Sequence, residues 1–157
     1  MRPTFYPLGL ASLALAACTR EPPPAPKPGL GNVMVQVARR FELAGRAAAA
    51  NRFELAEFEA GEIEETFEND VPGAELPKEG PTAQIPPLAK AFLETNAREL
   101  REAASKKDRA AFDAAFGRAA AACNGCHAAS AKPFIHVPSE PGKPVPDVDP
   151  LPAPSAR

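Results

Sequence analysis

The sequence predicts an all-α fold, an up-down-up-down antiparallel four-helix bundle. Prolines, which cost about 3 kcal/mol inside a helix, cluster in residues 22–28, in residues 72–87 and from residue 133 onward. Residues 30–70 and 88–132 therefore form two blocks without proline. Both blocks repeat apolar residues at the spacing of an amphipathic helix, and nothing in the chain shows the alternation of a strand.

The first block predicts two helices. Apolar side chains with one shared face define the first of them: Leu30, Met34, Val37, Phe41, Ala44 and Ala48. The pattern breaks near Asn51 and then resumes in a second set: Phe53, Ala56, Ala60, Ile63 and Phe67. The short link between the two helices favours antiparallel neighbours.

The second block predicts two more helices. A weaker stripe follows Pro86-Pro87, a pair that suits the first turn of a helix: Ala89, Leu93, Asn96, Leu100 and Ala103. Asp108 is the expected N-cap of a last helix with a clear stripe: Phe112, Phe116, Ala119, Cys123 and Cys126. In this topology the start of the first helix lies beside the end of the last, where the 72–87 loop and the C-terminal tail also emerge.

The end of the last helix carries a C-x-x-C-H motif, Cys123-Asn124-Gly125-Cys126-His127. Two thiols three residues apart share one side of a helical turn, where they can add to the two vinyl groups of a haem while the adjacent imidazole binds the iron. The motif therefore predicts one covalent haem c inside the bundle. Gly117, Gly125 and the alanines at 119–122 leave room for the ring.

Two other uses of these side chains remain open. A redox dithiol is one, but such motifs begin a helix in a βαβ setting, whereas this one follows an alanine-rich helical run. A zinc site is the other, with Cys123, Cys126, His127 and His136 as ligands. It would require the adjacent Cys126 and His127 to turn onto a single ion.

The N-terminus predicts a lipoprotein leader. Leu15-Ala16-Ala17-Cys18 has the form of a lipoprotein cleavage box, and the apolar run before it is too short to span a bilayer. Cys18 would then carry the lipid, which places the protein on the periplasmic side of a bacterial membrane. Thr19, in place of an aspartate, favours the outer membrane.

The same signals divide the chain into four parts. We expect a signal peptide in residues 1–17, a proline-rich tether in 18–29, a helical haem-binding domain in 30–132 and a proline-rich tail in 133–157. After cleavage, Cys123 and Cys126 are the only thiols that remain beside the lipidated one.

The charge pattern excludes nucleic acid as a partner. The formal net charge is −2, and the second helix concentrates acids: Glu54, Glu57, Glu59, Glu62, Glu64, Glu65, Glu68 and Asp70. Arginines on the flanking helices can neutralise them within the molecule: Arg39, Arg40, Arg46, Arg98 and Arg101. The alternative is a docking surface for a basic redox partner.

With this motif near the end of the fourth helix of an exported bundle, the chain resembles the class II c-type cytochromes, the cytochrome c-prime and cytochrome b562-like group. The resemblance covers about residues 30–132. It implies that Cys123 and Cys126 form the thioethers and that His127 is the proximal iron ligand. It also places the distal position on the first helix, where b562-like members have a methionine ligand and c-prime members a noncoordinating apolar residue.

Met34 is the only methionine of the mature chain, and it is the candidate distal ligand. His136 is a second candidate, because the tail begins at the haem end of the bundle. An open distal position is the third arrangement.

The expected function is that of a lipid-anchored monohaem electron carrier, which is not an enzyme and exchanges electrons with unidentified redox proteins. The alternatives are a five-coordinate haem protein that binds NO or CO, and an accessory haem subunit of a membrane redox complex. A homodimer is compatible with each of these functions.

Overall fold

The computed structural model describes residues 25–142. This part of the chain is all-α and contains no strand, which confirms the predicted class. Its α-helices are α1 (Leu30–Ala49), α2 (Phe53–Glu65), α3 (Ile85–Phe92), α4 (Arg98–Ser105) and α5 (Arg109–Ala129). Three short elements join them, namely the π-helical turns η1 (Thr66–Asp70) and η3 (Leu93–Ala97) and the 3-10 turn η2 (Thr82–Gln84).

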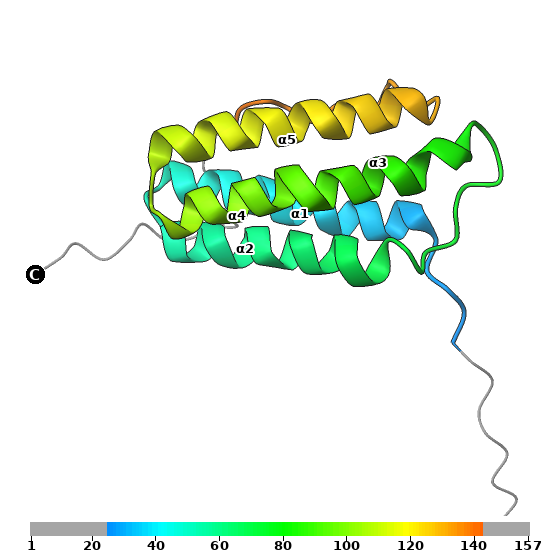
Figure 1. The fold of residues 1–157 in the computed structure, drawn as a ribbon, viewed down its shortest axis with the longest axis horizontal. Coiled ribbons are helices and arrows are strands. Elements are labelled where there is room, and N and C mark those ends of the chain that lie inside the picture. The colour runs from blue at the N-terminus through cyan, green and yellow to red at the C-terminus, as the bar shows by residue number, and fades with distance from the viewer. Residues whose placement is uncertain (1–24, 143–157) are drawn as a thin grey trace, which may run out of the picture.

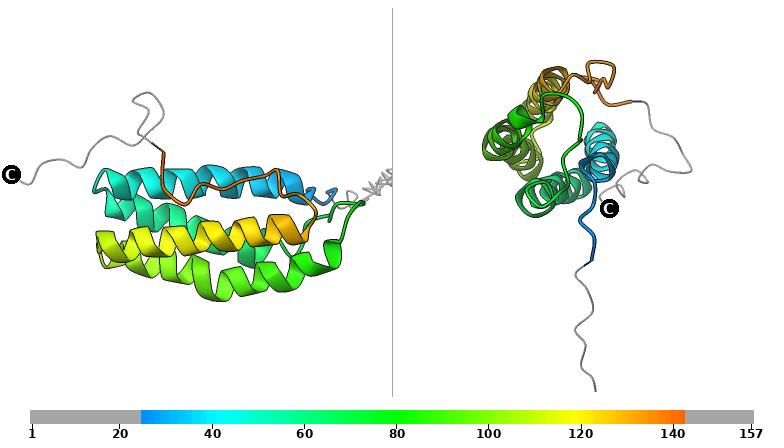
Figure 2. Two further views of the ribbon diagram at one scale, coloured as in Figure 1. Left: turned by 90° about the horizontal axis from the view of Figure 1, so that it is seen from above. Right: turned by 90° about the vertical axis from the view of Figure 1, so that its right-hand side faces the viewer.

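These elements form four long helical segments that lie side by side (Figures 1 and 2). The turn η1 continues α2, and η3 joins α3 to α4 without a break in the helical rod. Two ends of the molecule result. One holds the short links from α1 to α2 and from α4 to α5, and the other holds the start of α1, the end of α5 and the loop before α3 (Figure 1).

The helix boundaries follow from individual residues, as the sequence predicted. Asn51 has φ +58°, a left-handed conformation that ends the first helical segment. The Asp108 side chain accepts a 3.0 Å hydrogen bond from the Ala111 amide and caps α5. The two prolines after Ile85 lie in the first turn of α3, where no helical hydrogen bond needs their missing N–H groups.

Each of the two π-helical turns contains a threonine that bonds the preceding turn of the helix. Thr66 Oγ1 donates to the Glu62 carbonyl at 2.7 Å, and Thr95 Oγ1 donates to the Ala91 carbonyl at 2.6 Å. Such bonds compete with the backbone ladder and widen or bend a helix locally. Phe67 in η1 packs against Phe92, the residue before η3, with ring centroids 4.4 Å apart.

One hydrophobic core connects the four segments. All the predicted inward-facing residues are buried except five that are partly buried, namely Met34, Leu93, Asn96, Cys123 and Cys126. Phe41 stacks on Phe116 with ring centroids 4.1 Å apart, and Phe112 is completely buried. The core is therefore densest in the half of α5 that follows its N-cap.

The segments that precede and follow the helices along the chain both contact the helical domain. Glu75 in the loop before α3 donates from its backbone N–H to the Pro28 carbonyl and accepts from the Leu30 N–H, both at 2.9 Å. After α5 the chain turns at Ala131, which has φ +58°. Residues 133–142 then run back between α1 and α5 (Figure 2).

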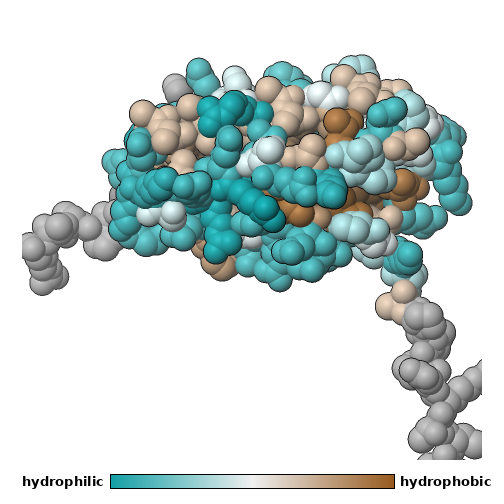
Figure 3. Space-filling model, viewed as in Figure 1, coloured by the Kyte–Doolittle hydropathy of each residue, from teal (hydrophilic) through white to brown (hydrophobic). Residues whose placement is uncertain are grey.

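The predicted leader, Cys18 and most of the tether lie outside the described residues, as does the tail beyond residue 142. Among residues 25–142, no helix is both long enough and apolar enough to cross a membrane. Hydrophilic residues cover most of the face in Figure 3, and the most hydrophobic ones reach the surface in the half that holds the end of α5.

Candidate functional site

The C-x-x-C-H motif occupies the last turns of α5. At about 100° of rotation per residue, Cys123 lies in line with Phe112 and Phe116, whose side chains are in the core. Cys126 and His127 flank that line by about 60° and 40° on opposite sides. All three potential haem-binding side chains therefore lie on the inward side of the helix, as the spacing predicted.

Burial along α5 stops where the motif begins. Up to Ala120 the inward-facing residues are buried: Phe112, Ala115, Phe116, Ala119 and Ala120. From Ala121 to Ala129 no residue of the helix is buried, although Cys123, Cys126 and His127 are partly covered. The motif thus lies on the inward side of a helix at a level where the side chains are only partly buried, which we call the half-filled level.

Apolar side chains border this half-filled level. Met34 on α1, Leu93 in η3, Ala122 and Cys123 are partly buried and pack against the core. The end of the molecule is otherwise well packed, because Leu30 of α1 and Ile85 of α3 are 8% and 5% exposed. Two thiols, an imidazole and an apolar border are the side chains that a covalently bound haem requires, so the residues present fit that group.

Both thiols are in the free form. Burial, and then the neighbouring Cys126, raise the pKa of Cys123 to about 12. Burial also raises the pKa of Cys126, against a lowering hydrogen bond with Ser130. Both groups are thus protonated near neutral pH, whereas a redox dithiol depends on a lowered thiol pKa at a helix N-terminus. The position at the C-terminal end of α5 disfavours the dithiol alternative.

The zinc alternative lacks a preformed set of ligands. Among residues 25–142, no three histidine, cysteine, aspartate or glutamate side chains lie close enough together to hold one metal ion. His136, which would be the fourth ligand, is exposed. Its neighbours Ile135 and Val137 bond to α5, so His136 lies on the tail beside that helix.

The His127 ring has a defined hydrogen bond. Its Nδ1 atom lies 3.0 Å from the backbone carbonyl oxygen of Ile135. Because a carbonyl oxygen can only accept, Nδ1 carries the proton of this hydrogen bond, and in a neutral ring Nε2 then has the free lone pair. That is the tautomer in which an imidazole binds iron through Nε2.

Asn124, the first variable position of the motif, holds the tail. Its amide nitrogen donates to the Val137 carbonyl at 2.9 Å, and its amide oxygen accepts from the Val137 N–H at 2.8 Å. Sequence reasoning missed this residue. No periodic pattern links positions 13 apart in a proline-rich segment, so the sequence contained no signal for the pair.

The two candidate distal ligands differ in their surroundings. Met34 is half-buried in the second turn of α1, and the start of α1 lies at the same end of the molecule as the end of α5 (Figure 2), which carries His127. His136 is exposed and follows the residue that bonds the Nδ1 side of His127. Met34 therefore lies on a helix that borders the half-filled level, whereas His136 is on the surface.

The acids of α2 are neutralised only in part. Arg40 pairs with Glu59 at 3.1 Å and with Glu62 at 2.7 Å, and both Arg98 and Arg101 pair with Glu64. Lys107 bonds Glu54 at 2.5 Å and lowers the pKa of that carboxyl group. Arg39 and Arg46 instead reach Glu42 on their own helix. The predicted internal pairing is thus confirmed for three of the five arginines.

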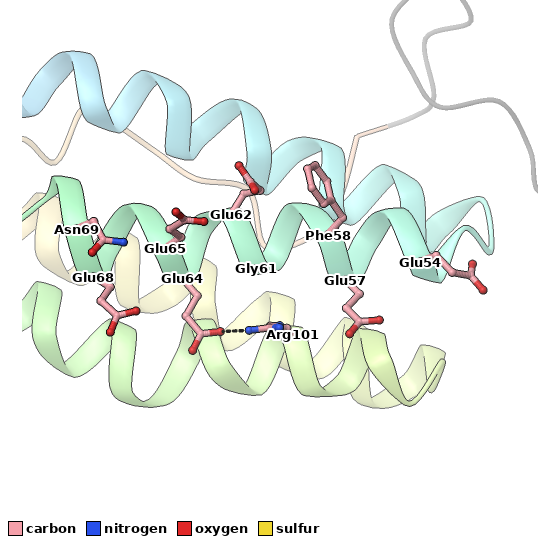
Figure 4. Close-up of a pocket in the computed structure, with 10 residues that line it drawn as sticks. All are labelled: Glu54, Glu57, Phe58, Gly61, Glu62, Glu64, Glu65, Glu68, Asn69 and Arg101. Atoms are coloured by element: carbon pink, nitrogen blue, oxygen red, sulfur yellow. Dashed lines mark hydrogen bonds and ion pairs between the residues drawn. The ribbon is translucent and has the colours of Figure 1, made fainter.

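Other carboxylates line an open groove along α2 (Figure 4). Within the described residues, Glu57, Glu65 and Glu68 of this groove form no ion pair. Phe58, which is 56% exposed, lies among them. The groove is therefore acidic with one aromatic side chain, and it lies on a different helix from the C-x-x-C-H motif.

Comparison with models of known protein families, with curated proteins and with solved structures found no match. The functional assignment therefore depends on the motif and its surroundings.

Proposed function

We propose that the protein is a monohaem c-type cytochrome that acts as a lipid-anchored electron carrier in the periplasm. Its four helical segments would form an up-down-up-down bundle that encloses one haem c. The observation that carries the proposal is a C-x-x-C-H motif on the inward side of α5, at the level where burial of that side stops.

Each side chain of the motif has a separate role. Cys123 and Cys126 would hold the haem covalently, each through a thioether formed when its S–H adds across one vinyl group. His127 presents its Nε2 lone pair as the proximal ligand, because Nδ1 donates to Ile135. When bound, the haem supplies one-electron exchange between ferric and ferrous iron.

Other residues would affect the reduction potential of the haem and the choice of redox partner. The apolar side chains around the motif would limit the access of water to a haem held there, which is one of the factors that set a haem potential. The unpaired carboxylates of α2 produce a negative surface that would steer a basic redox partner, with an effect that weakens in salt. We assign the chain no bond-making reaction of its own.

The test of haem attachment is denaturing electrophoresis followed by haem staining, together with acid-acetone extraction. Unchanged protein should retain haem in both, because thioethers do not dissociate. Cys123→Ala and Cys126→Ala should each weaken this retention, and the double variant should abolish it. Cys18→Ala is the matched control, since it removes the third thiol and should leave haem staining intact. Covalent haem in the double variant would refute the attachment sites.

The lipid anchor is tested separately. Cys18→Ser should yield an unprocessed or soluble protein that no longer incorporates labelled fatty acid. The double variant at Cys123 and Cys126 is the control and should still incorporate the label. An unchanged membrane fraction for Cys18→Ser would count against the cleavage box.

A further inference from the structure

A docked segment follows the motif and is part of the same site. We call residues 133–142 the strap, because they lie between α1 and α5 (Figure 2). The strap is bonded near its start by His127 and at its middle by Asn124. Near its end, Pro141 lies against Gly45 of α1. The strap therefore contacts both helices that border it.

Three features make this docking specific. Asn124 satisfies both backbone groups of Val137, which is a complete pair of hydrogen bonds from one side chain. Val137 itself packs against the core. A Cβ atom at Gly45 would lie 2.7 Å from the Pro141 side chain and 2.7 Å from the Phe116 ring, so α1 has no side chain where the strap crosses it.

The strap is also preorganised by its composition. Pro133, Pro138 and Pro141 fix their own φ angles, which lowers the conformational entropy lost when the segment docks. It presents the Ile135 carbonyl to His127 although the Ile135 and Phe134 side chains are 43% and 78% exposed. Burial of these side chains therefore does not explain the position of the carbonyl.

We propose that the strap is a positioning element of the haem site, in which the Ile135 carbonyl orients His127 and Asn124 holds that carbonyl in register. This inference rests on the proposed haem attachment. A histidine ligand that donates its second N–H to a carbonyl is fixed in orientation and is a more basic donor to the metal. The bond from Nδ1 should therefore favour ferric iron and lower the reduction potential.

The experiment uses the haem-loaded protein and three variants, two at Asn124 and one that lacks the strap. Asn124→Ala removes both bonds to Val137, and Asn124→Asp keeps only the acceptor. A stop codon after Lys132 removes the strap altogether. Asn69→Ala is the control for the potential, because Asn69 is an exposed asparagine on a different helical segment from the motif and its strap.

Two measurements separate docking from positioning. Docking is measured as the rate of chymotrypsin cleavage after Phe134, which should rise about tenfold or more in Asn124→Ala, because two hydrogen bonds are lost. Positioning is measured as the reduction potential. It should rise in Asn124→Ala and in the truncated protein, rise less in Asn124→Asp and stay unchanged in Asn69→Ala.

Each contrary result has a distinct meaning. Faster cleavage with an unchanged potential would show that the strap only packs, and an unchanged cleavage rate would show that Asn124 does not hold it. Either result overturns the inference while the haem remains attached. Haem staining of the unchanged protein comes first, and its failure would overturn the proposed function together with this inference. If the truncated protein does not fold, the comparison of Asn124→Ala with Asn124→Asp decides.

Discussion

The two halves of α5 differ in how deeply their inward-facing side chains are buried. The first half ends at Ala120 and the second at Ala129, and both follow the same helical periodicity. In the first half, Phe112 and Phe116 extend into the core and contact aromatic rings of their neighbours. In the second half the inward-facing positions hold Cys123, Cys126 and His127, and all three are only partly buried.

The difference does not come from fraying at the end of a helix. Leu30 and Val33 of α1 and Ile85 and Ala89 of α3 lie at the same end and are buried. The second half of α5 instead surrounds its motif with alanine and glycine, whose small side chains bury little apolar surface. Periodicity thus determines which side faces inward, whereas side-chain volume determines whether the chain alone can fill that side.

The largest expected effect on this comparison comes from the removal of both attachment thiols. If haem burial contributes about 3 kcal/mol to the second half of α5, Cys123→Ala with Cys126→Ala should accelerate amide exchange there about 100-fold. Exchange in the first half should change much less. Hydrogen exchange read by mass spectrometry measures both halves in one sample. Equal acceleration in both would show that the halves do not differ.

A core substitution in the first half should have the next largest effect. Phe112 is completely buried, so Phe112→Ala should destabilise the protein by about 3–5 kcal/mol. Phe134→Ala is the matched control, because Phe134 is 78% exposed, and it should change stability by less than about 0.5 kcal/mol. Urea unfolding followed by circular dichroism measures both. Similar losses in the two variants would contradict the described core.

Met34→Ala tests whether the half-filled level contains the distal ligand. If Met34 binds the iron, the unchanged protein should be low-spin with a far-red charge-transfer band in the ferric state. The variant should then become high-spin and bind CO quickly when reduced. A Met34→Leu variant controls for packing. High-spin iron and ready CO binding in the unchanged protein would identify Met34 as packing and favour the gas-binding alternative.

The smallest expected effect concerns the two thiols in protein prepared without haem. The pKa of Cys123 is raised from 9.0 to about 12 by burial, so its alkylation should be slower than that of Cys126 and should keep accelerating toward pH 12. Folding holds this proton more tightly, so its stabilising contribution is complete below about pH 9 and is lost as the pH rises. Faster alkylation of Cys123 than of Cys126 would contradict the described burial.

The helices were predictable because their causes are local. Proline exclusion, the left-handed Asn51 and the Asp108 cap each act within a few residues, so the segments and most of their inward faces follow from the sequence. The π-helical turns at Thr66 and Thr95 were not predicted. Threonine adopts many other conformations in helices, and its bond to the preceding turn leaves no distinct sequence pattern.

The candidate site was likewise predictable from the sequence only in part. The inward position of Cys123, Cys126 and His127 follows from their spacing on one helix. The partners of Asn124 and His127 do not, because they lie in the proline-rich tail, which was expected to emerge at this end but has no periodicity to define its path. The docked residues 133–142 extend the contacts of the domain past the predicted boundary at 132.

The bridge between the N-terminal segment and the loop before α3 has a mechanical consequence. Glu75 bonds the Pro28 carbonyl and the Leu30 N–H, one residue on either side of Gly29. A pulling force on the chain ahead of Pro28 is therefore shared between the first turn of α1 and the loop that contains Glu75. Tension applied at this end would therefore act on that loop as well as on α1, the helix that carries Met34.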